Sequence, residues 1–348
     1  MSTCATASRD LSEPLAGTAA TARTWLLLEQ PGPWGSKALT SSHLDPELGR
    51  ALEKAAEGTG VRIALIRRPG RHADCHATAR HQVYAGHTVP GRTWLRGAVL
   101  DDPRQLLDLD FAALGAGDHG GFGTPHTGDP LVLVCTNGKR DRCCALLGRP
   151  LAAALTDSGT EGAWEITHLG GHRFSPTLLV LPYGYAYGRM ETPAVKEILD
   201  AARAGRVRAE GCRGNSAWER PGQAAELAVR EATGEDAADA LRVVATDKAA
   251  RADGASGAGR AEGAGRADGA GGTGRAGGET THWEVTVAHV DGRRWRVTVA
   301  QEASLPPRPE SCGAALGSPA RMDVVAVRPL PENADGPTYE IPATVTSK

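Results

Sequence analysis

The 348-residue sequence has little that would direct it to a membrane or to nucleic acid. No apolar run approaches the roughly 18 residues that a membrane-spanning helix needs. Residues 1–17 lack the basic region and apolar core of a signal peptide. The 39 basic and 41 acidic residues nearly cancel, so no overall charge attracts DNA or anionic lipid. We therefore expect a soluble, cytoplasmic protein with no membrane and no nucleic-acid partner.

Cysteine is scarce, and its number is odd. The seven positions are Cys4, Cys75, Cys135, Cys143, Cys144, Cys212 and Cys312. An odd number in a chain without a secretion signal favours reduced thiols, metal ligands or redox groups over a disulfide framework. Aromatic residues make up only 4% of the chain, but apolar residues make up 41%, which is enough to build a core.

Larger apolar side chains are missing from residues 249–280, which consist almost entirely of Ala, Gly and Arg with a few acidic residues. Such a segment has nothing to anchor it in a core, so we interpret it as a disordered linker. The acidic residues between its arginines argue against a nucleic-acid-binding tract.

Before the linker, two halves of the chain show the same order of predicted elements. Apolar runs predict strands at 24–29, 61–67, 81–86 and 93–100 in the first half, and at 131–134, 163–167, 177–182 and 185–189 in the second. Within the first half, Asp45 caps a helix that Gly58 ends, and a short helix follows near 103–109. Within the second, a helix spans 143–155 with a kink or restart at Pro150, and Thr192 caps another. Strand, helix, strand, strand pair, helix is the order of a thioredoxin-like α/β fold, here in two tandem halves.

These patterns give five predicted segments. They are a first thioredoxin-like half (1–120), a second thioredoxin-like half (121–210), a helical and strand extension (211–248), the linker (249–280), and a C-terminal segment (281–348). The extension contains a helix around 223–232 and a strand near 241–245. In the C-terminal segment, Asp291-Gly292 between two alternating runs predicts a β-hairpin over 281–301 that docks onto the main body.

Two stretches, CTNGKRDRCC (135–144) and HLGGH (168–172), follow predicted strands. Loops after neighbouring parallel strands meet at one end of a sheet, so their cysteines and histidines can face one point. Thiolate with imidazole suits zinc, copper or an iron–sulfur cluster. C-x8-C is wider than an ordinary zinc knuckle and favours a larger object such as a two-iron cluster. The candidate ligands are Cys135, Cys144, His168 and His172.

The adjacent residues Cys143 and Cys144 point in different directions, so one of them is the ligand. We choose Cys144 and expect Cys143 to pack in the core. Gly170 and Gly171 would let the backbone approach the bound group and donate N–H groups to it.

The functions of the other charged and sulfur-containing residues are less clearly indicated by the sequence. The cations Lys139, Arg140 and Arg173 either tune the site and dock an acidic partner, or form a solvated basic surface. Residues 72–81 contain further His and Cys but match no common metal spacing. The remaining thiols, Cys4, Cys212 and Cys312, are far apart in the sequence and are interpreted as ordinary thiols.

CTNGKRDRCC, the GRP that follows, HLGGHRFSPTLLVLP and YGR together resemble the sucrase/ferredoxin-like family, a branch of the thioredoxin-like ferredoxins. The resemblance covers most of residues 4–200. It implies that 121–210 is a thioredoxin-like ferredoxin domain and that the first half, 1–120, has no cluster ligands. It implies that Cys135, Cys144, His168 and His172 bind a [2Fe–2S] cluster, with H-x3-H in place of the C-x3-C of related ferredoxins. It also supports Cys144 over Cys143. No carboxylate pair for glycoside hydrolysis is evident, so the "sucrase" part of the name has no support.

The predicted function is that of an electron-transfer protein with one [2Fe–2S] cluster, acting with a redox partner protein. Imidazole ligands keep a ring nitrogen that can couple proton to electron transfer. Whether the chain is itself an enzyme, as part of a reductase system, stays open. One alternative is a structural zinc protein with the same ligands. Another is a thiol oxidoreductase of thioredoxin type using Cys143-Cys144 or Cys135, although no C-x-x-C is present.

Overall fold

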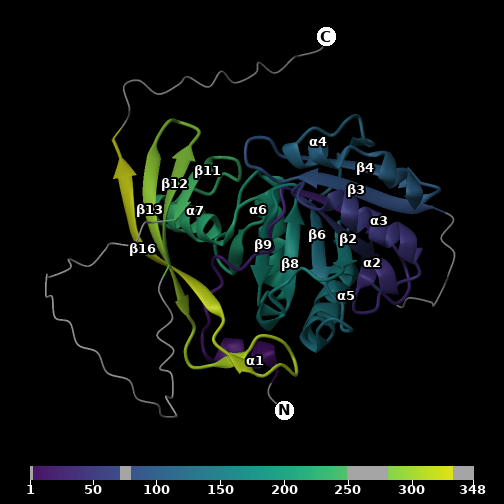
Figure 1. Ribbon diagram of the computed structural model, residues 1–348, viewed down its shortest axis with the longest axis horizontal. Helices are drawn as coiled ribbons and strands as arrows, with labels where there is room; N and C mark the ends of the chain where they lie inside the picture. The colour runs from purple at the N-terminus through teal and green to yellow at the C-terminus, as the bar shows by residue number, and fades with distance from the viewer. Residues whose placement is uncertain (1–2, 71–79, 249–280, 332–348) are drawn as a thin grey trace, which may run out of the picture.

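The computed structural model describes residues 3–70, 80–248 and 281–331. These residues form a mixed α/β structure with a ten-stranded mixed sheet, flanking helices and a separate four-stranded sheet (Figure 1). The predicted linker at 249–280 and residues 72–79 of the histidine-containing loop lie outside the described residues. No helix in the described part of the chain is long and apolar enough to cross a membrane.

The first half contributes four strands in the order β4-β3-β1-β2. Their bounds are β1 (Thr24–Glu29), β2 (Val61–Arg67), β3 (His81–His87) and β4 (Trp94–Leu100). β1 and β2 are parallel, whereas β3 is antiparallel to both β1 and β4. The short strand β5 (Thr124–Pro125) pairs with β4 at the edge of the sheet. All four predicted strands of this half are therefore present.

The second half repeats this arrangement in the order β9-β8-β6-β7. Its strands are β6 (Leu131–Cys135), β7 (Ala163–Ile166), β8 (Thr177–Leu181) and β9 (Tyr185–Gly188). β6 is parallel to β7 and antiparallel to β8, which is antiparallel to β9. The two halves join where β2 runs antiparallel to β7, and at this junction Arg67 Nη2 lies 2.7 Å from Glu165 Oε2.

Successive side chains on a strand point to opposite faces of the sheet, and the core follows that alternation. On one face, Leu26 and Leu28 of β1 belong to a cluster with α3 (Pro46–Ala56), while Val132 and Val134 of β6 pack with α5 (Arg149–Asp157). The residues of opposite orientation, including Cys135, form one cluster that both halves share. Cys135 therefore faces the surface that the two halves have in common.

The helices start largely where the sequence predicts. Asp45 accepts a hydrogen bond from the Glu47 N–H at 2.9 Å and so caps α3. The segment after β6 begins with a π-helical turn (Cys144–Gly148) and continues as α5, with Pro150 at its start. This agrees with the predicted restart, because proline lacks the N–H that the first turn of a helix leaves unpaired anyway.

Some helices differ from prediction. Thr192 is the first residue of α6 (Thr192–Arg203), and Glu191 occupies the cap position without a side-chain hydrogen bond, so the predicted cap is displaced by one residue. The helices α2 (Ala38–Ser41) and α4 (Phe111–Ala116) were not predicted. The segment predicted as a short helix near 103–109 is the 3-10 helix Pro103–Asp108.

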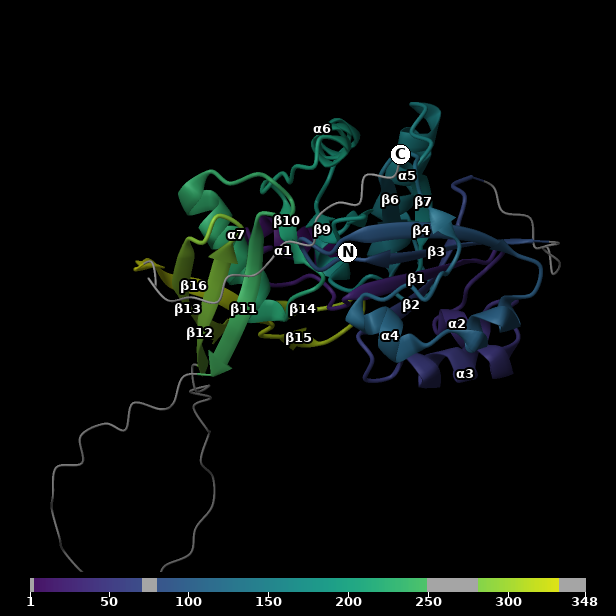
Figure 2. The same ribbon diagram turned by 90° about the horizontal axis from the view of Figure 1, so that it is seen from above.

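The C-terminal part forms its own sheet instead of adding strands to the main one. Its order is β11-β12-β13-β16, from β11 (Leu241–Lys248), β12 (Thr281–His289), β13 (Arg294–Ala303) and β16 (Ala320–Leu330). The predicted hairpin is present as β12 and β13. The helix α7 (Arg220–Thr233) packs its buried residues on this sheet, beside β10 (Cys212–Asn215), which is the last strand of the main sheet (Figures 1 and 2).

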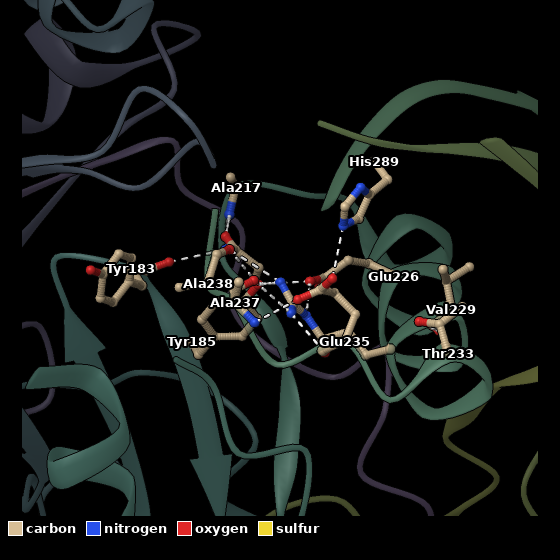
Figure 3. Close-up of polar contacts among 12 residues, drawn as sticks. Tyr183, Tyr185, Ala217, Glu226, Val229, Thr233, Glu235, Ala237, Ala238 and His289 are labelled. Carbon is tan, nitrogen blue, oxygen red and sulfur yellow. Dashed lines mark hydrogen bonds and ion pairs between the residues drawn. The ribbon is translucent and has the colours of Figure 1, made fainter. Parts of the chain in front are cut away.

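A buried polar network joins α7 to the main sheet (Figure 3). Tyr185 on β9 donates a hydrogen bond to Glu226 Oε1 at 2.7 Å, and Arg230 Nε donates to the same oxygen at 2.6 Å. Arg230 also donates to the carbonyl oxygens of residues 235, 237 and 238. On the second sheet, His289 Nε2 lies 2.8 Å from Glu235 Oε2. These contacts connect the two sheets through α7.

Two distant parts of the chain lie side by side at one end of the molecule. The helix α1 (Cys4–Asp10) packs against β14 (Arg308–Pro309), which pairs with β15 (Leu316–Gly317). Figure 1 shows α1 beside the yellow C-terminal segment, and the sequence did not predict α1. The segment between β13 and β16 thereby reaches the surroundings of the Cys-containing loop.

Candidate metal centre

The site begins at the ends of two adjacent parallel strands. Cys135 is the last residue of β6 and pairs in register with Ile166, the last residue of β7. Both loops therefore leave the sheet at the same edge, as the sequence predicted from strand direction. Cys135 and Cys144 are each only 1% exposed, and His168 and His172 are half-buried.

Three of the four predicted ligands lie together. The sulfur atoms of Cys135 and Cys144 and a ring nitrogen of His168 all lie within 4.8 Å of one another. The Ser175 hydroxyl donates to Cys144 Sγ at 3.9 Å. A group of two thiols and an imidazole at this spacing can hold a metal.

His172 lies beside this group without belonging to its tightest part. Its ring centroid is 5.2 Å from that of His168, and its Nε2 is 3.6 Å from Asp141 Oδ2. The Nδ1 atoms of both His168 and His172 are buried and have no hydrogen-bond partner among the described residues. Burial lowers the pKa of His172, so this imidazole favours the neutral form that a metal ligand needs.

The pKa values of the two thiols, Cys135 and Cys144, shift in opposite directions. A hydrogen bond from Cys144 lowers the pKa of Cys135 well below its usual range, and hydrogen bonds from His168 and the Leu169 N–H lower it further against the opposing effect of burial. That hydrogen bond and burial raise the pKa of Cys144. Of the two thiols, Cys135 is therefore the one that loses its proton more readily.

A buried arginine that the sequence reasoning missed supports the histidine loop. Arg213 on β10 is fully buried, and its Nη1 donates to Gly170 O at 3.1 Å. Gly170 and Gly171 have φ values of +79° and +66°, which favour glycine. A Cβ on Gly171 would lie 2.0 Å from Arg213 Nη2, so this arginine accounts for the second glycine. Burial lowers the pKa of Arg213 to about 10.

A second arginine reaches the site from the first half. Arg62 on β2 donates through Nη2 to His168 O at 3.0 Å, and its guanidinium lies 5.3 Å from the Trp25 ring centroid. Burial lowers the pKa of Arg62, and the negative charge of Cys135 offsets only part of that effect. The half without candidate ligands thus contributes a cation to the site, which no sequence signal indicated.

The predicted basic surface separates into two parts. Lys139 and Arg140 are exposed on the loop between Cys135 and Cys144. Arg173 instead points inward, with its Nε donating to Glu13 Oε1 at 2.8 Å and its guanidinium 4.5 Å from the Phe174 ring centroid. Of the three predicted cations, Lys139 and Arg140 can meet a partner, whereas Arg173 holds the buried Glu13.

The structure brings together three cysteines outside the predicted ligand set. Cys143 is buried as expected, in a small core cluster with Cys4, and Cys312 packs against that cluster. The Sγ of Cys143 lies 3.0 Å from that of Cys312 and 3.4 Å from that of Cys4. Together with Asp141 these residues form a second group that can hold a metal. The group combines three chain segments that are more than 100 residues apart, so the sequence reasoning missed it.

The neighbouring cysteines Cys143 and Cys144 therefore serve different groups. Cys144 lies with Cys135, while Cys143 lies with Cys4 and Cys312. All cysteines in the described residues are free thiols. The geometry gives no support to a redox pair formed by Cys143 and Cys144, since their side chains belong to separate clusters.

Comparison with known protein families matches residues 15–214, more than half of the chain, to the sucrase/ferredoxin-like family. The matched range contains the two halves of the main sheet through β9, most of β10 and all four predicted ligands. No curated protein and no solved structure matches the chain.

Proposed function

Because the chain belongs to the sucrase/ferredoxin-like family, we propose that it is an electron-transfer protein that binds one [2Fe–2S] cluster. One observation carries the proposal: two buried thiols lie beside two imidazoles whose Nδ1 atoms are buried and have no partner. Buried polar atoms without partners are costly, and bonds to a metal would satisfy them. The proposed ligands are Cys135, Cys144, His168 and His172.

The donor set of these residues fits such a cluster. When bound, a [2Fe–2S] cluster supplies reversible one-electron transfer, and two thiolates with two neutral imidazoles bring its oxidised form to zero formal charge. Cys135 already favours the thiolate form, and burial keeps His172 neutral. Asp141, with Oδ2 3.6 Å from Nε2 of His172, is placed to orient that ring through its charge.

The buried arginines have a role in electron uptake. Arg62 and Arg213 are cations in the low-dielectric surroundings of Cys135. An added electron increases the negative charge of the site, and fixed cations stabilise that charge more strongly inside a protein than in water. Arg62 comes from the first half and Arg213 from β10, so both flanking parts would help to set the potential.

The exposed part of the site suggests how a partner docks. His168 and His172 are half-buried, and Lys139 and Arg140 are exposed on the adjoining loop. We propose that an acidic redox partner protein in the cytoplasm contacts this basic loop and exchanges electrons through the histidine side.

The strand order supports thioredoxin-like halves. Both the order β4-β3-β1-β2 and the order β9-β8-β6-β7 place a parallel pair beside an antiparallel pair. We propose that the first half, 1–120, and the ferredoxin domain, 121–210, arose from one such unit, followed by the extension 211–248 and the C-terminal segment 281–348.

The test is a visible absorption spectrum of freshly purified protein with iron and sulfide assays, before and after dithionite. We expect a red-brown protein with about two irons per chain that bleaches on reduction and then gives a Rieske-like paramagnetic signal. The matched variants Cys135→Ser and Cys212→Ser separate a ligand from a buried thiol in the main core. Loss of iron is expected in the first only.

Two other outcomes would replace this proposal. A colourless protein whose zinc disappears in Cys135→Ser would make the same residues a structural zinc site. A colourless, metal-free protein after anaerobic reconstitution would leave the Cys135 thiolate as the reactive group of a thiol oxidoreductase.

A further inference from the structure

Three thiols and a carboxylate meet next to the candidate metal centre, outside the proposed cluster ligands. The Sγ atoms of Cys4, Cys143 and Cys312 lie 3.4, 3.5 and 3.0 Å apart in pairs. The Asp141 carboxylate oxygens lie 3.9 and 4.0 Å from Cys4 Sγ. All four side chains bring a ligand atom within 4.8 Å of the others.

The carboxylate is held in place by the backbone of the cysteines themselves. Asp141 Oδ1 accepts a hydrogen bond from the Cys143 N–H at 2.8 Å, and Oδ2 accepts one from the Cys312 N–H at 2.9 Å. The Asp141 side chain is only 1% exposed. A buried carboxylate fixed among three thiols is an arrangement in which a cation would be strongly stabilised.

We propose that Cys4, Asp141, Cys143 and Cys312 form a second metal site, which binds zinc. Zinc takes four ligands in a tetrahedron, and Zn–S bonds of about 2.3 Å place the sulfur atoms about 3.8 Å apart. The three sulfur pairs here need to separate by only a few tenths of an ångström to about 0.8 Å to reach that spacing. This inference does not depend on the [2Fe–2S] proposal, because none of its ligands belongs to that set.

The mixed donor set selects zinc over other thiol-binding metals. Thiolates alone suit copper(I) and iron–sulfur clusters, whereas a carboxylate ligand is common for zinc and unfavourable for copper(I). An iron–sulfur cluster would spread its thiolates over several irons, but these three sulfur atoms surround one point. A disulfide would use two of the three thiols and leave the third without a role.

The site would connect three segments that are far apart in the sequence. Cys4 lies on α1, Cys143 on the loop after β6, and Cys312 between β14 and β15. The seven residues of α1 and the two-residue strands β14 and β15 are too short to be stable alone. A bound metal contributes its binding free energy to holding such segments together.

The site also adjoins the proposed cluster. Cys143 precedes Cys144 in the chain, and Asp141 lies 3.6 Å from His172 Nε2. A metal bound by Cys143 and Asp141 would fix the backbone that carries Cys144 and the orientation of His172. The zinc site would therefore be structural and would stabilise the backbone next to the proposed redox site.

The test is elemental analysis of the full-length protein and of single Ser variants. We expect about one zinc per chain in the wild type. Zinc should fall to background in Cys4→Ser and Cys312→Ser, while iron is largely retained. In Cys135→Ser the reverse is expected, with iron lost and zinc retained. Cys212→Ser, a buried thiol outside both groups, should keep both metals. Failure of the cluster proposal and failure of the zinc proposal are therefore distinguishable.

A second measurement uses the wild type alone, in case a variant does not fold. Native mass spectrometry should show the mass of one zinc, and a mercurial thiol reagent should release it to a colorimetric zinc chelator. A wild-type chain without zinc would overturn the proposal, whether Cys143 and Cys312 are joined as a disulfide, iron occupies the site, or all three thiols react with an alkylating reagent in the folded protein.

Discussion

At the scale of single residues, the proposed ligands His168 and His172 matter because an imidazole would bind a metal without adding charge, whereas a thiolate adds one negative charge. The charges near the two histidines come from other residues, namely Asp141 and the buried arginines Arg62 and Arg213. If the proposed cluster is bound, its reduction potential should therefore depend on the ligand type as well as on these neighbouring charges.

Replacing either histidine by cysteine should lower the potential. His168→Cys and His172→Cys each add a negative charge to the proposed cluster, which disfavours the added electron by roughly a hundred mV or more. Redox titration of the visible absorbance measures the change. His126→Cys, in the loop before β6, is the control and should leave the potential unchanged. A rise in potential in the two ligand variants would contradict the charge argument.

His87 gives a prediction about pH. Thr24 Oγ1 donates to Leu114 O and lies 2.8 Å from His87 Nδ1, so Nδ1 carries the proton of the neutral ring. His87 Nε2 is buried and has no partner in the described part of the chain, and burial lowers the pKa of His87 to about 4. As the pH falls from about 6.5, the unfolded state takes up this proton first, so stability is lost down to about pH 4.

Urea unfolding at about pH 7 and about pH 5 measures this loss. His87→Asn keeps an amide donor near Thr24 but cannot be protonated in this range, so its stability should fall less between the two conditions. His126→Asn serves as a control and should behave as the wild type. Equal losses in wild type and His87→Asn would show that His87 is not responsible.

At the scale of elements, α7 connects the two sheets through ionised groups instead of apolar contacts alone. Glu226 and Arg230 are four residues apart on this helix, with side chains 0% and 2% exposed. The Tyr185 hydroxyl donates to the same carboxylate. Because both side chains are removed from water, the loss of one would leave the other as an uncompensated buried charge.

Arg230→Met should destabilise the protein by about 3–5 kcal/mol, because it leaves the Glu226 charge buried and uncompensated. Arg203→Met is the matched control: Arg203 is 41% exposed in its ion pair with Asp129, and its loss should cost less than about 1 kcal/mol. Urea unfolding compares the two. Adding Glu226→Gln to Arg230→Met should restore part of the loss. Equal effects at the two arginines would rule out the buried-charge explanation.

At the scale of the whole molecule, residues 249–280 connect two strands that already lie next to each other. Lys248 at the end of β11 pairs with Trp283 in β12, and the strands are antiparallel. A short turn is therefore sufficient to join them. The 32 residues between Lys248 and Thr281 are not needed to span any distance.

Replacing residues 249–280 by about four Gly and Ser residues should leave the metal content and visible spectrum unchanged. Three halvings of the loop length should stabilise the protein by about 2 kcal/mol, because closing a shorter loop loses less entropy. Urea unfolding and metal analysis are the measurements. Loss of colour in the shortened protein would mean that the segment contributes to the cluster site, against the linker interpretation.

The sequence by itself determined the strands of both halves and the approach of Cys135, Cys144 and His168. These depend on local signals: apolar runs, a capping Asp45, a proline at a helix start, and candidate ligands placed at or just after the ends of strands that proved to be parallel. Local periodicity also predicted the hairpin of β12 and β13. These signals arise from interactions between residues that are close together in the chain, so they can be recognised in a single sequence.

Only the tertiary structure decided which distant residues meet. Cys4 and Cys312 are 308 positions apart, yet their sulfur atoms lie 3.5 Å from each other. Arg62 and Arg213 reach the site from β2 and β10. In the second sheet, β11 pairs with β12 across residues 249–280, and β13 pairs with β16 across residues 304–319. Such contacts depend on how whole elements pack, for which spacing along the chain gives no signal.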